Sequence, residues 1–146
     1  MLIQDVMTKS PVCCTPEDTV ERVAKLMAEH DCGVIPICDA KGVAGVITDR
    51  DITCRAVTTG KASSSIRVSE VMTKKVITVR ADEDVQTAID LMEKNQVRRL
   101  PVVDAKGKVA GIVAPSDLAP LFASTNVADF LLAVSYWTRK KTPVAV

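Results

Sequence analysis

Aromatic side chains are scarce in this sequence, which limits both the core and the possible partners. The 146 residues include 1 Trp, 1 Tyr and 2 Phe, and none of them precedes Phe122. Because 47% of the residues are hydrophobic, the core must be built from aliphatic side chains, which suits small strands packed against helices. Single-stranded nucleic acids bind on exposed aromatic platforms. No such platform is expected in residues 1–121.

An excess of charge of one sign is also lacking. The 19 Lys and Arg residues balance 18 Asp and Glu residues, for a formal net charge of +1, and no block of like charge stands out. Nucleic-acid-binding proteins carry a basic face or stripe, so no nucleic-acid partner is expected. No apolar run reaches the roughly 18 residues of a membrane span, and the N-terminal MLIQDVMTKS has no signal-peptide core. We therefore expect a cytoplasmic protein without a membrane partner.

Metal ligands and catalytic groups are few. His30 is the only histidine, and none of the cysteines forms a C-x-x-C pair; these are Cys13, Cys14, Cys32, Cys38 and Cys54. A structural zinc site needs four clustered ligands, so we predict no metal, and we interpret the cysteines as small hydrophobes in a reducing compartment. A redox role for Cys13 and Cys14 is the alternative. Without a nucleophile–base pair or a G-x-x-x-x-G-K-[ST] loop, we predict no enzymatic activity and no cofactor.

An internal repeat is the main feature of the chain. The sequence matches itself at an offset of 65, which becomes 66 after one extra residue near Lys108. The matching pieces are Val6–Lys9 with Val71–Lys74, Leu26–Met27 with Leu91–Met92, Asp39–Gly42 with Asp104–Gly107, and Asp51 with Asp117. A unit of about 50 residues buries too little apolar surface to be stable alone. The two copies must therefore pack on each other.

Each copy predicts the same order of elements: strand, helix, hairpin, helix. In the first copy we expect a strand at 12–15, a helix that begins at 16–19, hairpin arms at 34–38 and 43–47, and a second helix that begins at 48–49. The second copy repeats these at 76–79, 85–92, 100–103, 109–113 and 115–116. We thus predict an α/β (α+β) fold of two tandem β-α-β-β-α repeats about a pseudo-two-fold axis, with a C-terminal helix.

The repeat also sets the domain boundaries. We assign residues 1–60 to the first repeat, 61–70 to a linker, 71–122 to the second repeat, and 123–146 to the C-terminal helix and tail. The last segment places four apolar residues on one helical face, namely Val127, Phe130, Leu131 and Val134, and Tyr136 and Trp137 follow. Such a stripe predicts a core or dimer contact, and we expect it to close a homodimer.

Three features occur twice, in order and at matching spacing. They are the Val-Met-Thr lead-in, the apolar strand around Pro36 or Pro101, and the run from Gly45 to Asp51 with its counterpart Gly111 to Asp117. Together they resemble the CBS (cystathionine β-synthase) domain family, and in particular its small stand-alone bacterial pairs. The resemblance covers residues from about 3 to 122. It implies CBS-type repeats with a cleft between them that binds an adenosyl ligand.

The resemblance also implies a function. It suggests a non-catalytic regulatory module, a ligand sensor that reports to an unidentified regulated protein. We expect AMP, ADP or ATP rather than S-adenosylmethionine or NAD, because Arg98 and Arg99 favour phosphates over a sulfonium group. The alternative is a structural dimerisation module with a vestigial ligand site.

Individual site roles follow from the same resemblance. Thr48 and Asp51 lie three apart on the first turn of a helix, where Asp51 accepts hydrogen bonds from ribose hydroxyls. Arg98 and Arg99 reach the phosphates, and the adenine lies against four residues, Val12, Cys13, Ile35 and Pro36. Simpler roles stay open: an N-cap for Thr48, a surface ion pair of Asp51 with Arg50 or Arg55, and a solvated strand edge for the two arginines.

The two copies are unequal at these positions. Ala114 stands where the first copy has Thr48, and Gly33 and Val34 stand where the second has Arg98 and Arg99. If each ligand site draws on both repeats, as in the family, both losses fall on one cleft. That cleft keeps Ser116 and Asp117 and has no basic group, so we predict one competent nucleotide site and a second, weaker one. If each site draws on a single repeat, both are weak.

Overall fold

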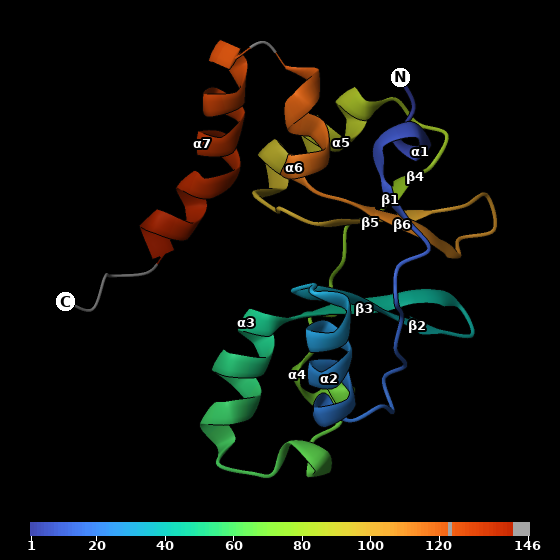
Figure 1. The fold of residues 1–146 in the computed structure, drawn as a ribbon, viewed down its shortest axis with the longest axis vertical. Helices are drawn as coiled ribbons and strands as arrows, with labels where there is room; N and C mark the ends of the chain where they lie inside the picture. The colour runs from blue at the N-terminus through green and yellow to red at the C-terminus, as the bar shows by residue number, and fades with distance from the viewer. Residues whose placement is uncertain (123, 142–146) are drawn as a thin grey trace.

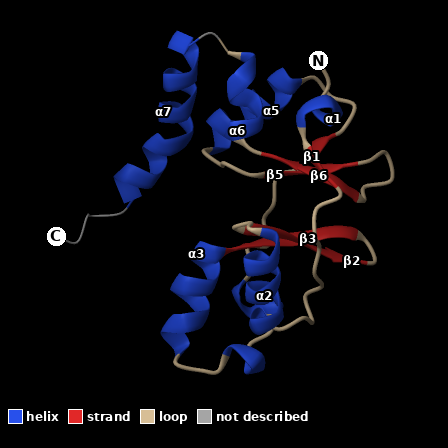
Figure 2. Ribbon diagram, viewed as in Figure 1, coloured by secondary structure: helices blue, strands red, loops and turns tan. Residues whose placement is uncertain are grey.

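The computed structural model describes residues 1–122 and 124–141. Figure 1 shows two stacked units whose sheets face each other, with the helices on the outer sides. The element types are separated in the same way in Figure 2, where the strands of both units lie between two groups of helices. The predicted α/β fold of two packed repeats is confirmed.

The first unit is built on the predicted elements. Helix α2 (Val20–His30) begins after Thr19, whose side chain accepts a hydrogen bond from the Arg22 amide at 3.2 Å, an N-cap arrangement. Strands β2 (Val34–Asp39) and β3 (Gly42–Thr48) form the hairpin. Helix α3 (Asp49–Asp51) continues as a π-helix (Ile52–Ala56) and a 3₁₀ turn (Val57–Thr59), so the chain stays helical for eleven residues after Thr48.

The second unit repeats this order with a shorter final helix. Its elements are β4 (Val79–Arg80), α5 (Val85–Asn95), β5 (Leu100–Val103), β6 (Val109–Val113), α6 (Pro115–Leu118) and a 3₁₀ turn (Ala119–Leu121). Pro120 lies within that turn, and proline cannot donate an amide to continue a helix. The remaining elements lie before, between and after the two repeated sets: α1 (Ile3–Val6), β1 (Thr8–Lys9), a 3₁₀ turn (Ser63–Ser65), α4 (Val68–Val71) and α7 (Ser124–Lys141).

The first strand of each repeat is shorter than the sequence predicted. The strand expected at 12–15 is a single parallel bridge between Cys14 and Ile37, and the one expected at 76–79 begins only at Val79. Local chemistry explains the first case. Pro11 has no amide to donate, and the Thr15 amide donates to the Asp18 carboxylate at 2.8 Å instead of to a neighbouring strand.

The lead-in of each repeat crosses to the other unit. Strand β1 pairs antiparallel with β6 through Thr8 and Ile112, and the sheet has the order β1-β6-β5-β4. An isolated antiparallel bridge between Thr73 and Val46 repeats this pairing on the first unit, at the offsets of 65 and 66 found in the sequence. The two crossings are thus related by the pseudo-two-fold axis.

Glycine permits both crossings. A Cβ atom on Gly45 would lie 2.5 Å from the Thr73 carbonyl oxygen, and one on Gly111 would lie 2.8 Å from that of Thr8. Real Cβ atoms do not approach backbone this closely, so the first position of each Gly-x-x-Thr/Ala-x-x-Asp run needs glycine.

Two separate cores result from the crossings. Ile3 is buried in the second core, whereas the first core includes four residues that follow the first repeat: Ile66, Val68, Val71 and Met72. Our ranges 1–60 and 71–122 therefore describe the repeats along the chain and not the two packed cores.

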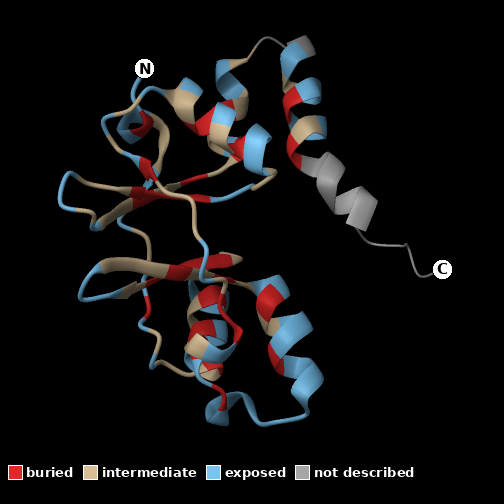
Figure 3. Ribbon diagram, turned by 180° about the vertical axis from the view of Figure 1, so that it is seen from behind, coloured by how far each residue is buried: buried red, intermediate tan, exposed pale blue. Residues whose placement is uncertain are grey.

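Helix α7 packs into the second core. Phe130 and Val134 are buried, and the Phe130 ring stacks on Phe122 with centroids 5.2 Å apart. Figure 3 shows this buried side of α7 turned toward the unit. Leu131 is 42% exposed, so its predicted place on the same face is wrong, because successive helical residues are rotated by about 100°. The side chains of Tyr136 and Trp137 lie outside the described residues, and the homodimer stays a prediction. No helix in the described part of the chain is long and apolar enough to cross a membrane.

Candidate functional site

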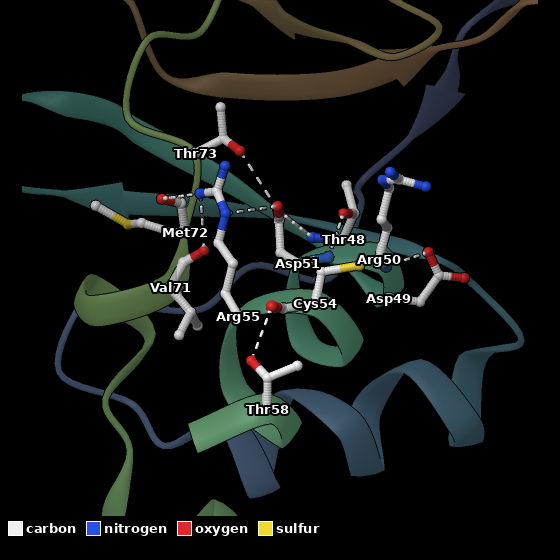
Figure 4. Close-up of polar contacts among 10 residues, drawn as sticks. All are labelled: Thr48, Asp49, Arg50, Asp51, Cys54, Arg55, Thr58, Val71, Met72 and Thr73. Carbon is white, nitrogen blue, oxygen red and sulfur yellow. Dashed lines mark hydrogen bonds and ion pairs between the residues drawn. The ribbon is translucent and has the colours of Figure 1, made fainter. Parts of the chain in front are cut away.

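Thr48 and Asp51 form a reciprocal cap at the start of α3 (Figure 4). The Thr48 hydroxyl oxygen accepts a hydrogen bond from the Asp51 amide at 3.1 Å, and Asp51 Oδ2 accepts one from the Thr48 amide at 3.0 Å. The N-cap role considered for Thr48 is therefore present. Asp51 is only 8% exposed, and the cap fixes its side chain at the end of β3.

The amides at this helix start already have partners within the protein. The Asp49 amide donates to the Gly33 carbonyl at 3.0 Å, and the Arg50 amide donates to Asp49 Oδ1 at 2.8 Å. The Asp51 amide is used by Thr48. A phosphate at this end must therefore be met by basic side chains, because these three amides of the helix N-terminus are not free.

Two further groups meet the Asp51 carboxylate. The Thr73 hydroxyl donates to Asp51 Oδ2 at 3.4 Å, and Arg55 Nε lies 3.9 Å from Asp51 Oδ1. Of the two arginines considered as ion-pair partners, Arg55 is the one beside Asp51. Thr73 was missed from the sequence, although the repeated Val-Met-Thr lead-in was a signal for it.

The predicted second site lies in a cleft of about 400 Å³ between the units. This volume lies in the range of small-molecule sites. The wall comprises the crossing segment 8–12, the 30–34 segment that leads from α2 into β2, and Ser116 and Asp117 at the start of α6. Asp117 Oδ2 accepts a hydrogen bond from the Ala114 amide at 2.8 Å, but Ala114 has no hydroxyl to accept one from the Asp117 amide. The cap here is one-sided.

This second cleft does contain basic groups, so our expectation that it has none is wrong. Lys9 and Arg99 both line it. Val34, the repeat counterpart of Arg99, lines the same cleft, which places this pair of positions near the pseudo-two-fold axis. Arg99 therefore does not belong to the Thr48 side alone. Its guanidinium Nη1 donates to the Arg98 carbonyl at 3.0 Å, and both arginines are exposed.

The four predicted adenine contacts are not brought together. Val12 lines the Ser116/Asp117 cleft because its segment crosses to the other unit. Cys13 lines a separate hollow between the two hairpin turns, beside Cys38. Pro36 is buried in β2, and the Ile35 side chain is fully buried in the first core. The adenine pocket stays a prediction, with Ile35 able to offer a ligand only its backbone.

Cys13 and Cys14 do not face each other as a redox pair would. Cys14 is buried in the first core, whereas Cys13 is exposed on the opposite face. Partial burial, and next the neighbouring Cys38, raise the pKa of the Cys13 thiol to about 12. A thiol with a raised pKa is a poor nucleophile at neutral pH. Among the described residues, no group of three or more His, Cys, Asp and Glu side chains is placed to hold a metal ion.

The structure thus consists of two repeats related by a pseudo-two-fold axis, each with an aspartate that accepts a backbone hydrogen bond at the end of its hairpin. The sequence pattern of the CBS domain matches residues 3–56 and 68–124. The chain belongs to the CBS-domain family, as its sequence indicated. CBS pairs are in general regulatory ligand-binding modules without catalytic activity.

Relatives and solved structures agree with this assignment. The chain is 36% identical over 117 residues to the CBS domain-containing protein YhcV of Bacillus subtilis (strain 168), a match that covers 80% of this chain and 82% of YhcV. The CBS domain pair of protein MJ0100, solved with 5′-methylthioadenosine and S-adenosyl-L-methionine, superposes with a TM-score of 0.73 at 31% identity, over 84% of this chain and 95% of that one. CBSX2 in complex with AMP gives a TM-score of 0.69 at 25% identity, over 82% and 94%.

Proposed function

We propose that this protein is a non-catalytic sensor that binds AMP, ADP or ATP beside Thr48 and Asp51 and reports the occupancy to a regulated protein. The observation that carries the proposal is the reciprocal cap, which holds a nearly buried carboxylate at the end of β3. A carboxylate accepts hydrogen bonds only, so it suits the paired hydroxyls of a ribose. The Thr48 oxygen accepts from the Asp51 amide, which leaves its own proton free to donate to a ligand.

Repeat symmetry supports a ligand that carries phosphate on this side. The pseudo-two-fold axis relates each residue of the Ser116/Asp117 cleft to its repeat counterpart on the Thr48 side. Three small residues of that cleft have basic counterparts on the Thr48 side: Ser10 corresponds to Lys75, Gly33 to Arg98, and Ser116 to Arg50. Lys9 is matched by Lys74. The Thr48 side therefore has more positive charge, and charge-assisted hydrogen bonds favour phosphate groups there.

Calorimetric titration with AMP, ATP, S-adenosylmethionine and NAD tests this proposal. We expect AMP or ATP to bind with a Kd in the micromolar range, about −8 kcal/mol, and to bind more tightly than S-adenosylmethionine. Asp51→Ala should abolish the binding, since it removes the ribose acceptor. The matched control is Asp5→Ala, because Asp5 also accepts a backbone hydrogen bond at a helix start but is exposed and lies on α1, away from Asp51 in the sequence.

A structural dimerisation module with a vestigial cleft is the second candidate. One observation favours it: the protein's own groups already use the helix-start amides and the Asp51 carboxylate. A folded dimer that binds none of the four ligands would support this second function and contradict the sensor.

A further inference from the structure

Arg55 connects the Asp51 carboxylate to the segment that enters the second unit. Its Nη1 donates to the carbonyl oxygens of Val71 and Met72 at 3.3 and 3.5 Å. Its Nε faces Asp51 at 3.9 Å. Figure 4 shows the guanidinium between these groups, with Thr73 reaching Asp51 from the same segment. One side chain thus spans the proposed ribose acceptor and the crossing segment 71–73.

The hydrogen bonds to the two carbonyls are the stronger part of this link. The Arg55 side chain is 54% exposed, and an exposed ion pair at 3.9 Å is screened by water and contributes little. A guanidinium that donates to backbone carbonyls restrains them directly, and the carbonyls of Val71 and Met72 immediately precede the pairing of Thr73 with Val46. Arg55 therefore acts on the position of the crossing segment.

The second unit has no counterpart of this link. The repeat offset places Leu121 at the position of Arg55, after the break at Pro120. The crossing segment on that side has Thr8 in place of Thr73, and Leu121, which is 40% exposed, has no donor for its carbonyl groups. Leucine at the counterpart position suggests Arg55→Leu as the substitution that removes the hydrogen-bond donors.

We infer that Arg55 is a positioning residue that couples ligand occupancy at Asp51 to the crossing segment 71–73. The inference rests on the proposed function for its ligand. Ribose hydroxyls that donate to Asp51 compete with Thr73 and Arg55 for the same two carboxylate oxygens. Occupancy then loosens Thr73 from the first unit, and this segment passes the change to the second unit. A ligand shifts such an equilibrium only through contacts that differ between the two states, and the Asp51 contacts are of that kind.

Amide hydrogen exchange at Thr73 measures the coupling, because this amide donates to the Val46 carbonyl at 2.8 Å across the crossing. In the ligand-free protein, Arg55→Leu should accelerate this exchange by about fivefold, the effect of losing roughly one net hydrogen bond. Arg55→Lys should restore part of the protection. Arg22→Leu is the charge-matched control, since Arg22 forms an exposed ion pair with Asp18 on α2 and should leave Thr73 unchanged.

Saturating AMP provides the second arm. It should accelerate Thr73 exchange more in the unmodified protein than in Arg55→Leu, where only the competition with the Thr73 hydroxyl is left, although the variant still binds AMP by calorimetry. Ligand-free exchange in Arg55→Leu equal to that of Arg22→Leu would overturn the positioning role. Slower exchange with AMP, or equal acceleration in both proteins, would overturn the coupling while leaving the sensor intact. Absence of AMP binding in the unmodified protein would overturn the sensor and the coupling together, and the ligand-free arm would still decide the positioning role.

Discussion

The two units share one backbone plan and differ in the segment after the hairpin. In the first unit the chain stays helical from Asp49 to Thr59, which brings Arg55 to Asp51. In the second, Pro120 stops the helix, and the chain returns as α7 to bury Phe130. The comparison shows that two repeats can keep the same hairpin and aspartate while the next segment holds Arg55 beside Asp51 in one copy and packs α7 against the core in the other. It also provides matched positions for experiments.

The largest effect is expected in the packing of the second unit. Phe130→Ala removes a buried ring that stacks on Phe122, and we expect a loss of about 3–5 kcal/mol in the free energy of unfolding. Urea denaturation measures it. Leu131→Ala, at the exposed neighbouring position, should change stability by less than about 0.5 kcal/mol. Equal effects of the two changes would show that α7 is not part of the core.

The crossing segments give the next effect. Gly45→Ala places a Cβ 2.5 Å from the Thr73 carbonyl oxygen, and we expect it to cost about 1–3 kcal/mol of stability by overpacking. Gly111→Ala should cost less, because its shortest contact, 2.5 Å, is to the flexible Met7 side chain and the Thr8 carbonyl oxygen is 2.8 Å away. Thermal unfolding of the two variants ranks them. The reverse order would contradict the tighter crossing at the first unit.

Substitutions at the two helix caps should change stability by smaller amounts and in opposite directions. Thr48→Ala removes a hydroxyl that accepts from the Asp51 amide, whereas Ala114→Thr adds one at the counterpart position. We expect a loss and a gain of about 1 kcal/mol, respectively, in the free energy of unfolding. The double variant should be near the unmodified protein in urea denaturation, since the two sites are separate. A destabilising Ala114→Thr would mean that the second cap lacks room for the side chain.

The smallest effect concerns reactivity. Partial burial, and next the neighbouring Cys38, raise the pKa of Cys13 to about 12, while its counterpart in the second repeat is Thr78. The thiolate is the reacting form, so alkylation of Cys13 should rise about tenfold per pH unit from pH 8 to pH 10. A free cysteine, with a pKa of about 8.5, levels off over this range. Mass mapping after brief iodoacetamide treatment measures the rates, and a plateau by pH 9 would contradict the raised pKa.

Local features of the fold could be predicted from the sequence, because each has a local signal. The helix after Thr19 and the hairpin turns at Gly42 and Gly107 follow from caps, apolar spacing and the exact repeat. The crossing of the lead-ins could not be predicted, because Thr8 and its partner Ile112 are far apart in the sequence and nothing near Thr8 specifies that partner. The same crossing explains why Val12 lines the other cleft and why Thr73 reaches Asp51.

The difference between the two clefts was predictable in part. The loss of the threonine at Ala114 is visible in the sequence, and the structure shows its one-sided cap. The place of Arg99 was not visible, because Arg99 lines the Ser116/Asp117 cleft together with its own counterpart Val34, near the pseudo-two-fold axis, and only the packed units define that axis.

Calorimetric stoichiometry decides whether the chain binds a nucleotide only beside Asp51, with the unmodified protein, Asp51→Ala and Asp117→Ala titrated with the same adenine nucleotide. The two aspartates are repeat counterparts, so each variant is the control for the other. We expect one site per chain with a Kd in the micromolar range, lost in Asp51→Ala and retained in Asp117→Ala. Two equal sites per chain, or a single site lost only in Asp117→Ala, would contradict it.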